Sequence, residues 1–216
     1  MRFLVLAVSM LMWSMTAFAA PFKLAVFGDS LSVGYKLPVT DAFYTQLENT
    51  LHAKGYKNVS VINFSKSGDT TSDGIKRLSS LISSRPDGVL LELGINDAIR
   101  SMPIDGIERN LQRIIERLQK ANIPVMLIGM QVPPVNTPSY ARAFNNMYQE
   151  LARKNGLLLC PFFMKDVLVF NFAKKSFDLT YLLSDGIHPN ATGVKMMVNN
   201  VLPTVIEFLN ENGAKP

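Results

Sequence analysis

The sequence predicts an α/β fold of three layers, α/β/α, in which helices cover both faces of one five-stranded parallel sheet. Short runs of almost continuous apolar sequence recur five times, as is typical of parallel strands that are buried on both faces. Segments whose apolar residues are spaced three or four apart lie between these runs and indicate helices. Right-handed crossovers between such strands favour the flavodoxin-like strand order 2-1-3-4-5.

The expected strands are residues 22–27, 59–64, 88–93, 125–130 and 157–160. Each expected helix between them carries one apolar stripe. The stripes consist of Phe43, Leu47 and Leu51; of Ile75, Leu78 and Ile82; of Ile104, Ile107, Leu111, Ile114, Leu118 and Ala121; and of Phe144, Met147, Tyr148 and Leu151. A final helix should follow Asn190, a suitable N-cap, and Pro203 is expected to kink or split it.

The composition indicates one globular domain. Hydrophobic residues make up 48% of the 216 residues and charged residues 18%, which excludes a disordered chain. The length suffices for one well-buried core and favours a single domain, residues 20–216, over two domains.

The first residues are typical of a secretory signal. Arg2 precedes the nearly continuous apolar stretch of residues 3–13, and the small residues Ala17 and Ala19 suit a signal peptidase. We therefore expect cleavage between Ala19 and Ala20 and a periplasmic or secreted protein. The alternative is an uncleaved amino-terminal anchor, although a span needs about 20 apolar residues.

The net charge and the cysteine content limit which binding partners and metal sites the chain can have. The net charge of +5 falls to +4 without residues 1–19, which allows contact with an anionic membrane surface but supplies no basic run for nucleic acid. The single cysteine, Cys160, follows apolar residues and is expected to be a buried small hydrophobe. With one cysteine and two histidines, neither a disulfide nor a zinc site is expected.

Four polar segments are expected at one edge of the sheet, where the carboxyl ends of parallel strands meet. They are residues 28–31 (Gly-Asp-Ser-Leu), 65–69 (Ser-Lys-Ser-Gly-Asp), 94–97 (Gly-Ile-Asn-Asp) and 184–190 (Ser-Asp-Gly-Ile-His-Pro-Asn). Ser30 is the candidate nucleophile, although a serine after a strand can also be only a turn residue or a helix cap. Together these segments hold the groups that acyl transfer needs.

His188 is the candidate general base because it lies in a loop and no apolar stripe includes it, whereas His52 is expected at a helix end. Asp185, three residues earlier, could orient its ring, or could simply form a turn with Gly186. Asp166 and Asp178 are weaker candidates for the orienting acid.

Gly68 and Asn96 are the candidate donors for an oxyanion. A glycine lets its backbone N–H approach a substrate closely, and asparagine offers a side-chain amide. Each also has an ordinary structural explanation, a tight turn for Gly68 and a left-handed backbone for Asn96. The pattern G-x-G-x-x-G and the P-loop pattern are both missing, which argues against a phosphate site.

In order along the chain, the four segments resemble the four motif blocks of the SGNH (GDSL) hydrolases. Further details are similar to the bacterial thioesterase I, arylesterase and lysophospholipase subfamily, among them residues 67–71 (Ser-Gly-Asp-Thr-Thr) and 161–164 (Pro-Phe-Phe-Met). The resemblance covers essentially the whole mature chain. Close relatives in this subfamily are periplasmic and accept a broad range of acyl substrates.

The resemblance implies Ser30 as nucleophile, His188 as base and then acid, and Asp185 as its orienter. It also implies an oxyanion hole formed by the N–H groups of Ser30 and Gly68 and by the Asn96 side chain. Possible acyl-pocket residues are Ile95, where this subfamily often has a second glycine, and Val132, in the loop of residues 129–134.

The expected function is that of a serine esterase and thioesterase acting on acyl esters of small molecules or lipids, as a monomer and without metal or cofactor. One alternative is a carbohydrate O-deacetylase with the same machinery. This is less favoured because the only tryptophan, Trp13, lies in the signal segment. The other alternative is a non-catalytic periplasmic binding protein.

Overall fold

The computed structural model describes residues 21–132, 137–171 and 176–216, and it confirms the predicted fold. Five parallel strands form one sheet in the order β2-β1-β3-β4-β5. They are β1 (Phe22–Phe27), β2 (Val59–Asn63), β3 (Gly88–Leu91), β4 (Val125–Ile128) and β5 (Leu159–Cys160). The expected signal segment and its cleavage site lie outside the described residues.

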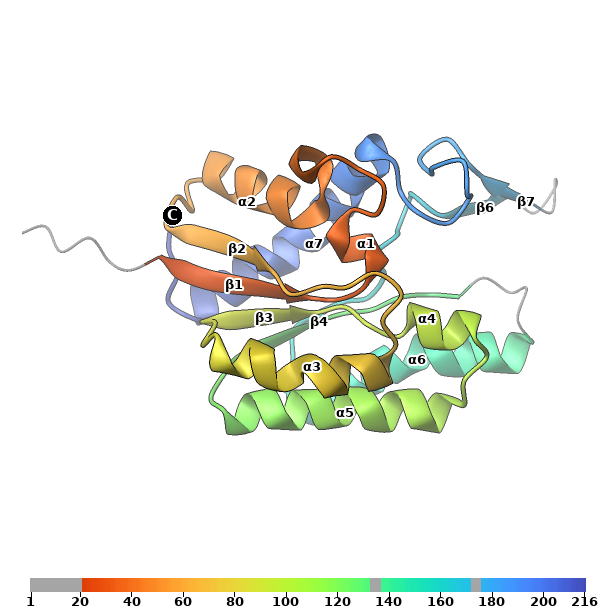
Figure 1. The fold of residues 1–216 in the computed structure, drawn as a ribbon, viewed down its shortest axis with the longest axis horizontal. Coiled ribbons are helices and arrows are strands. Elements are labelled where there is room, and N and C mark those ends of the chain that lie inside the picture. The colour runs from red at the N-terminus through yellow and green to blue at the C-terminus, as the bar shows by residue number, and fades with distance from the viewer. Residues whose placement is uncertain (1–20, 133–136, 172–175) are drawn as a thin grey trace, which may run out of the picture.

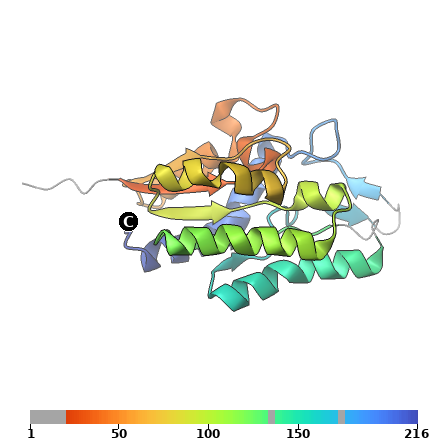
Figure 2. The ribbon, with the colours of Figure 1, turned by 60° about the horizontal axis from the view of Figure 1, so that its bottom comes forward.

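The helices lie in two layers, one on each face of the sheet (Figures 1 and 2). One layer holds α1 (Ser30–Val33), α2 (Phe43–Ala53) and α7 (Ala191–Glu211), with the 3-10 turn η1 (Val39–Asp41) before α2. The other holds α3 (Thr71–Ser83), α5 (Ile104–Lys120) and α6 (Pro138–Asn155), and the short helix α4 (Ile95–Ile99) follows β3 at the edge where the strands end.

The central strands are buried on both faces, as predicted, and the last four residues of β1 and all of β3 and β4 are buried. The strands β2, β3 and β4 end one or two residues earlier than predicted, and β5 begins two residues later. Leu93 and Met130 remain buried beyond the strand ends. The apolar runs therefore extend into segments that pack at the sheet edge, and burial alone does not mark the end of strand pairing.

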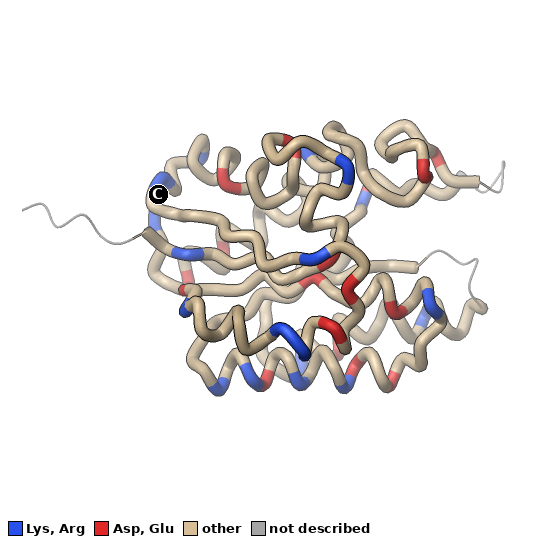
Figure 3. The backbone as a smooth tube through the Cα atoms, viewed as in Figure 1, with Lys and Arg blue, Asp and Glu red and all other residues tan. Residues whose placement is uncertain are grey.

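The predicted helix stripes are largely confirmed. In α5, Ile107, Leu111, Ile114 and Leu118 are buried. Both positively and negatively charged residues lie along this helix in Figure 3. The buried face of α3 is rotated relative to the prediction. Gly74, Leu78 and Leu81 are buried, whereas the predicted Ile75 and Ile82 are only half-buried.

Pro203 does not split the last helix, which was one of its two predicted effects, because α7 continues through this residue to Glu211. Pro203 removes one backbone N–H from the helix and leaves the carbonyl of Asn199 without that donor. Both residues are exposed, so water can hydrate the carbonyl. The helix is held by its opposite face, where Val201 and Val205 are fully buried.

An antiparallel hairpin, β6 (Val169–Asn171) and β7 (Ser176–Asp178), was not predicted from the sequence. It lies at the edge of the molecule where the parallel strands end (Figure 1). None of the helices in the described parts of the chain combines the length and the apolar composition that crossing a membrane requires.

Candidate active site

Ser30 is the first residue of α1 and follows the end of β1 by three positions. Asp29 caps this helix, because its Oδ1 accepts the Leu31 N–H at 3.0 Å. The cap fixes the turn between strand and helix. It thereby holds the Ser30 side chain at the carboxyl edge of the sheet.

Three of the predicted residues form a continuous chain of hydrogen bonds. His188 Nε2 lies 2.9 Å from Ser30 Oγ, and His188 Nδ1 lies 3.0 Å from Asp185 Oδ2. The Asp185 carboxylate also accepts the backbone N–H groups of His188 and Ile187, and these bonds, led by that of His188, lower its pKa to about 2. An ionised carboxylate can only accept, so Nδ1 carries the proton and Nε2 is free to accept from the Ser30 hydroxyl.

The weaker candidates do not join this chain. Asp178 lies in β7 and accepts hydrogen bonds from the backbone and side chain of Thr180. Asp166 lies in an exposed turn with a left-handed backbone. His52 lies in the last turn of α2, as predicted, where its Nε2 is 2.8 Å from the Val59 carbonyl.

Tyr35 is a neighbour of the histidine that the sequence reasoning did not assign. Its ring centroid lies 4.4 Å from that of His188, with an angle of 39° between the rings. The Lys36 ammonium in turn lies 5.1 Å from the centroid of Tyr35. Tyr35 thus supports one face of the imidazole and limits its rotation.

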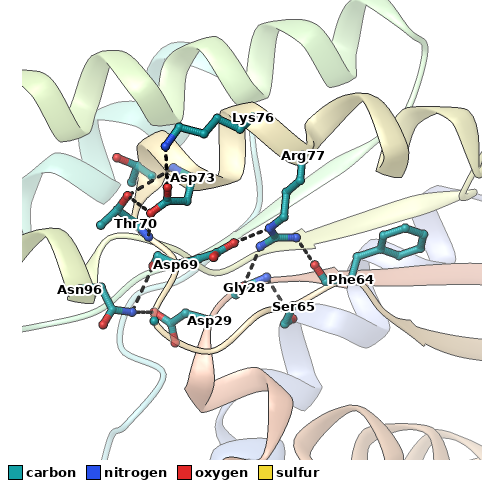
Figure 4. Close-up of polar contacts among 12 residues, drawn as sticks. Gly28, Asp29, Phe64, Ser65, Asp69, Thr70, Asp73, Lys76, Arg77 and Asn96 are labelled. Carbon is teal, nitrogen blue, oxygen red and sulfur yellow. Dashed lines mark hydrogen bonds and ion pairs between the residues drawn. The ribbon is translucent and has the colours of Figure 1, made fainter.

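The Asn96 amide connects α1 with the loop before α3 (Figure 4). Its Nδ2 donates to Asp29 Oδ2 at 3.0 Å and to the Asp69 carbonyl at 3.1 Å. Gly68 in that loop has φ of 82°, a conformation that favours glycine, and nothing lies within 4 Å of the place where a Cβ would be. Its carbonyl accepts from Arg100 at 3.0 Å.

Arg77, which the sequence reasoning missed, joins the ends of β1 and β2 (Figure 4). Its guanidinium donates to the Gly28 carbonyl at 2.9 Å, to the Phe64 carbonyl and to the Asp69 carboxylate. It also lies 4.0 Å from the centroid of the Phe27 ring. One charged group therefore joins the loop that leads to Ser30 with the segment that follows β2.

A second acid is buried behind the nucleophile. Glu92 is fully buried, and its Oε2 accepts from Ser32 at 2.8 Å and from the Asp29 N–H at 3.3 Å. A Cβ on Gly28 would lie 2.5 Å from this oxygen, so only glycine allows the carboxyl so close to the turn. The other oxygen, Oε1, is buried without a hydrogen-bond partner among the described residues.

Burial raises the pKa values of both acids, and nearby carboxylates add to each shift: Asp69 and Asp97 act on Asp29, and Asp29 acts on Glu92. The pKa of Asp29 is raised to about 7, although the donors Leu31 and Asn96 partly oppose the effect of burial. The pKa of Glu92 is raised well above its usual range, first by burial and then by the charge of Asp29. Glu92 has the weaker set of donors, so it holds the proton when Asp29 ionises.

A cavity of about 400 Å³ opens beside Ser30 and His188. Its apolar wall is formed by Leu31, Ile95, Ile99, Met130, Met164, Leu168, Phe177 and Ile187. Asn96 also lines it, whereas Val132 and Gly68 do not. Ile99 and Ile187 are 61% and 53% exposed, so they form the rim of the cavity.

Within the described residues, no group of three or more His, Cys, Asp or Glu side chains could hold a metal ion. Cys160 is buried, as predicted, and burial raises the pKa of its thiol to about 11.

Comparison with known proteins identifies the family of the chain. A model of the GDSL-like lipase/acylhydrolase family matches residues 26–196. The chain belongs to this family. The predicted resemblance is thus confirmed, and this GDSL acylhydrolase is a hydrolase of ester bonds.

Individual relatives of this acylhydrolase extend over most of its length. An arylesterase of Vibrio mimicus is 34% identical over 188 residues, which make up 87% of this chain and 90% of that protein. The thioesterase 1/protease 1/lysophospholipase L1 of Escherichia coli is 35% identical over 173 residues, 80% of this chain and 77% of that protein. A crystal structure of TesA has a TM-score of 0.79 and 32% identity, and the match covers 87% of this chain and 99% of that one.

The buried acid makes stability depend on pH, and Glu92→Gln tests this. Because the folded-state pKa of Glu92 is raised, the folded protein binds more protons than the unfolded chain above about pH 4.5. Wild-type stability therefore falls as pH rises toward the folded-state pKa. We therefore expect the free energy of unfolding of the variant, minus that of wild type, to increase as pH rises from 5 to 8. The increase should be at most about 1.4 kcal/mol per pH unit, and urea unfolding measures it.

The matched control is Glu116→Gln on the exposed face of α5. It should leave the pH dependence of unfolding as in wild type. A difference between Glu92→Gln and wild type that stays constant over this pH range would contradict a proton-binding role for the buried carboxyl.

Proposed function

We propose that this GDSL acylhydrolase is a serine esterase and thioesterase that cleaves acyl esters through an acyl-enzyme on Ser30. The observation that carries the proposal is the unbroken line of hydrogen bonds from Asp185 through His188 to Ser30, at the side of an apolar cavity. The names of the arylesterase and thioesterase relatives support both substrate classes.

In the first half of the reaction, Ser30 Oγ attacks the acyl carbon while its proton moves to His188 Nε2. The tetrahedral intermediate collapses, and His188 returns that proton to the leaving alcohol or thiol. In the second half, His188 takes a proton from water as the water oxygen attacks the acyl-enzyme. The carboxylic acid leaves, and the proton returns to Ser30 Oγ. Asp185 holds the ring in the required tautomer and stabilises its charged form.

The oxyanion of each intermediate would be held by the N–H groups of Ser30 and Gly68 and by the Asn96 amide. Asn96 donates to two protein acceptors in the resting enzyme. A charged oxygen binds an N–H more strongly than a neutral carbonyl does. The hydrogen directed at Asp69 can therefore turn toward the oxyanion when the charge develops.

The lining of the cavity supports an acyl chain as the occupant rather than a sugar. Its wall is mostly aliphatic, and Phe177 is its only aromatic ring other than His188 among the described lining residues. This weakens the alternative of a carbohydrate O-deacetylase. The exposed rim residues Ile99 and Ile187 suit a monomer that takes acyl esters from solution or from a lipid surface.

Replacing Ser30 by alanine tests the nucleophile. We expect Ser30→Ala to abolish turnover of p-nitrophenyl butyrate, because no acyl-enzyme can form, while the thermal midpoint of unfolding stays close to that of wild type. Mass spectrometry should detect one fluorophosphonate adduct on wild-type Ser30 and none on the variant. Full activity of a pure Ser30→Ala preparation would rule out this mechanism, and an unlabelled wild type would favour a binding protein.

Replacing Asn96 by alanine tests the third oxyanion donor. We expect kcat to fall about 10²–10³-fold with a much smaller change in KM, because such donors act mainly in the transition state. Steady-state kinetics on the butyrate ester measures both constants. If instead KM rises and kcat is unchanged, Asn96 binds the ground state of the substrate.

We also propose that residues 1–19 are a signal peptide and that the mature enzyme is periplasmic. The described fold supports this, because β1 begins at Phe22, directly after the expected cleavage point. Intact-mass measurement of enzyme recovered from the periplasm should give a chain that starts at Ala20. Recovery of the full-length chain bound to membranes would instead support an uncleaved anchor.

A further inference from the structure

A second cavity of about 230 Å³ lies beside the active-site cavity. Three residues, Gln131, Leu168 and Phe177, line both, so these side chains form the partition between them. The remaining wall of the second cavity consists of Val132, Asn145, Phe162 and Phe170. The cavities therefore adjoin each other, and the second lies farther from Ser30.

The wall of this second cavity is mostly apolar, and its two polar side chains need no partner inside it. Its residues other than Gln131 and Asn145 are aliphatic or aromatic. Asn145 Oδ1 accepts the Val132 N–H at 3.0 Å, so its carbonyl oxygen is already bonded to protein. Gln131 is exposed and can turn its amide to solvent. An aliphatic chain can thus enter without leaving a buried acceptor at Asn145 unsatisfied.

The hairpin β6–β7 contributes Phe177 to the partition and Phe170 to the far wall. Phe170 in β6 and Phe177 in β7 are paired across the strands, and their ring centroids lie 5.1 Å apart in an edge-to-face arrangement. Phe177 contacts both cavities, whereas Phe170 lines only the second. Leu168 lies directly before β6. The hairpin therefore supplies apolar wall to a second cavity that adjoins the cavity containing Ser30.

We propose that the second cavity is a distal acyl subsite. It receives the far end of a long acyl chain, which passes Leu168 and Phe177 and lies against Val132, Phe162 and Phe170. This inference rests on the proposed esterase function of Ser30. It assigns to the hairpin a preference for long acyl chains over short ones, because a short chain ends within the first cavity.

The size of the effect follows from hydrophobic transfer. Burying one methylene group raises the binding constant of the acyl chain about fourfold. If the same contact is kept in the transition state, kcat/KM rises by the same factor. Three or four methylenes in the distal subsite would thus raise kcat/KM by at least about tenfold, even if part of the gain is lost in ordering the chain.

The test is a series of p-nitrophenyl esters from acetyl to palmitoyl, compared between wild type and Val132→Phe. The phenylalanine ring is larger than the valine side chain that it replaces and should fill the second cavity. We expect kcat/KM for acetyl and butyryl esters within about twofold of wild type, and a loss of at least about tenfold for esters from decanoyl upward. Val169→Phe is the matched control, because Val169 is 45% exposed on β6 and lines neither cavity.

A second variant keeps the test decisive if Val132→Phe does not fold. Phe170→Ala opens the far wall and should cause the same selective loss for long chains. The proposal is overturned if either folded variant keeps the wild-type ratio of decanoyl to butyryl kcat/KM, or loses activity equally at all lengths. Failure of the proposed function looks different, because wild type would then hydrolyse no ester of any length and would not react with fluorophosphonate.

Discussion

Because the five strands run parallel, the segments that follow β1, β2 and β3 must meet at one edge of the sheet, and each contact of the site depends on that constraint. The paired register joins Val26 to Asn63 and Phe27 to Leu91, so Gly28, Phe64 and Glu92 follow directly after the paired residues at this edge. Arg77 bridges two of these segments through the carbonyl groups of Gly28 and Phe64. Ser30, the proposed nucleophile, is thus held in place by the sheet, so its hydroxyl would need little reorganisation to react.

This arrangement brings several acids into a small volume. Asp29, Glu92 and Asp97 are all buried within the contacts that surround the nucleophile. Asp97 accepts hydrogen bonds from the backbone N–H and the hydroxyl of Thr71, the first residue of α3 after its N-cap Thr70. Burial nevertheless raises its pKa, as it does for the other two. The site therefore separates its carboxyls by environment: Asp185 is ionised in a loop, and Glu92 is kept neutral in the core.

Much of this could be predicted from the sequence. The strand order and the four polar segments followed from apolar periodicity and from the rule that ligand sites lie at the carboxyl ends of parallel strands. What could not be predicted depended on side chains that meet only in three dimensions. Arg77 belongs to a helix and looks like any solvated cation in sequence. The hairpin β6–β7 is three residues long in each strand, too short for a periodic signal. Val132, a possible acyl-pocket residue from the sequence, lines the second cavity and not the cavity that contains Ser30, and no sequence pattern distinguishes the two cavities.

The histidine reaches the serine from 158 residues farther along the chain, and its loop is held by the final helix, whose cap Asn190 also donates to the Thr180 carbonyl. During synthesis Ser30, the proposed nucleophile, therefore leaves the ribosome long before His188, its proposed base. Residues 191–211 must also leave the ribosome before the loop has a support. A nascent or truncated chain contains Ser30 yet lacks the group that activates it. In the proposed mechanism, hydrolysis of esters therefore begins only after this late segment has been synthesised and has folded.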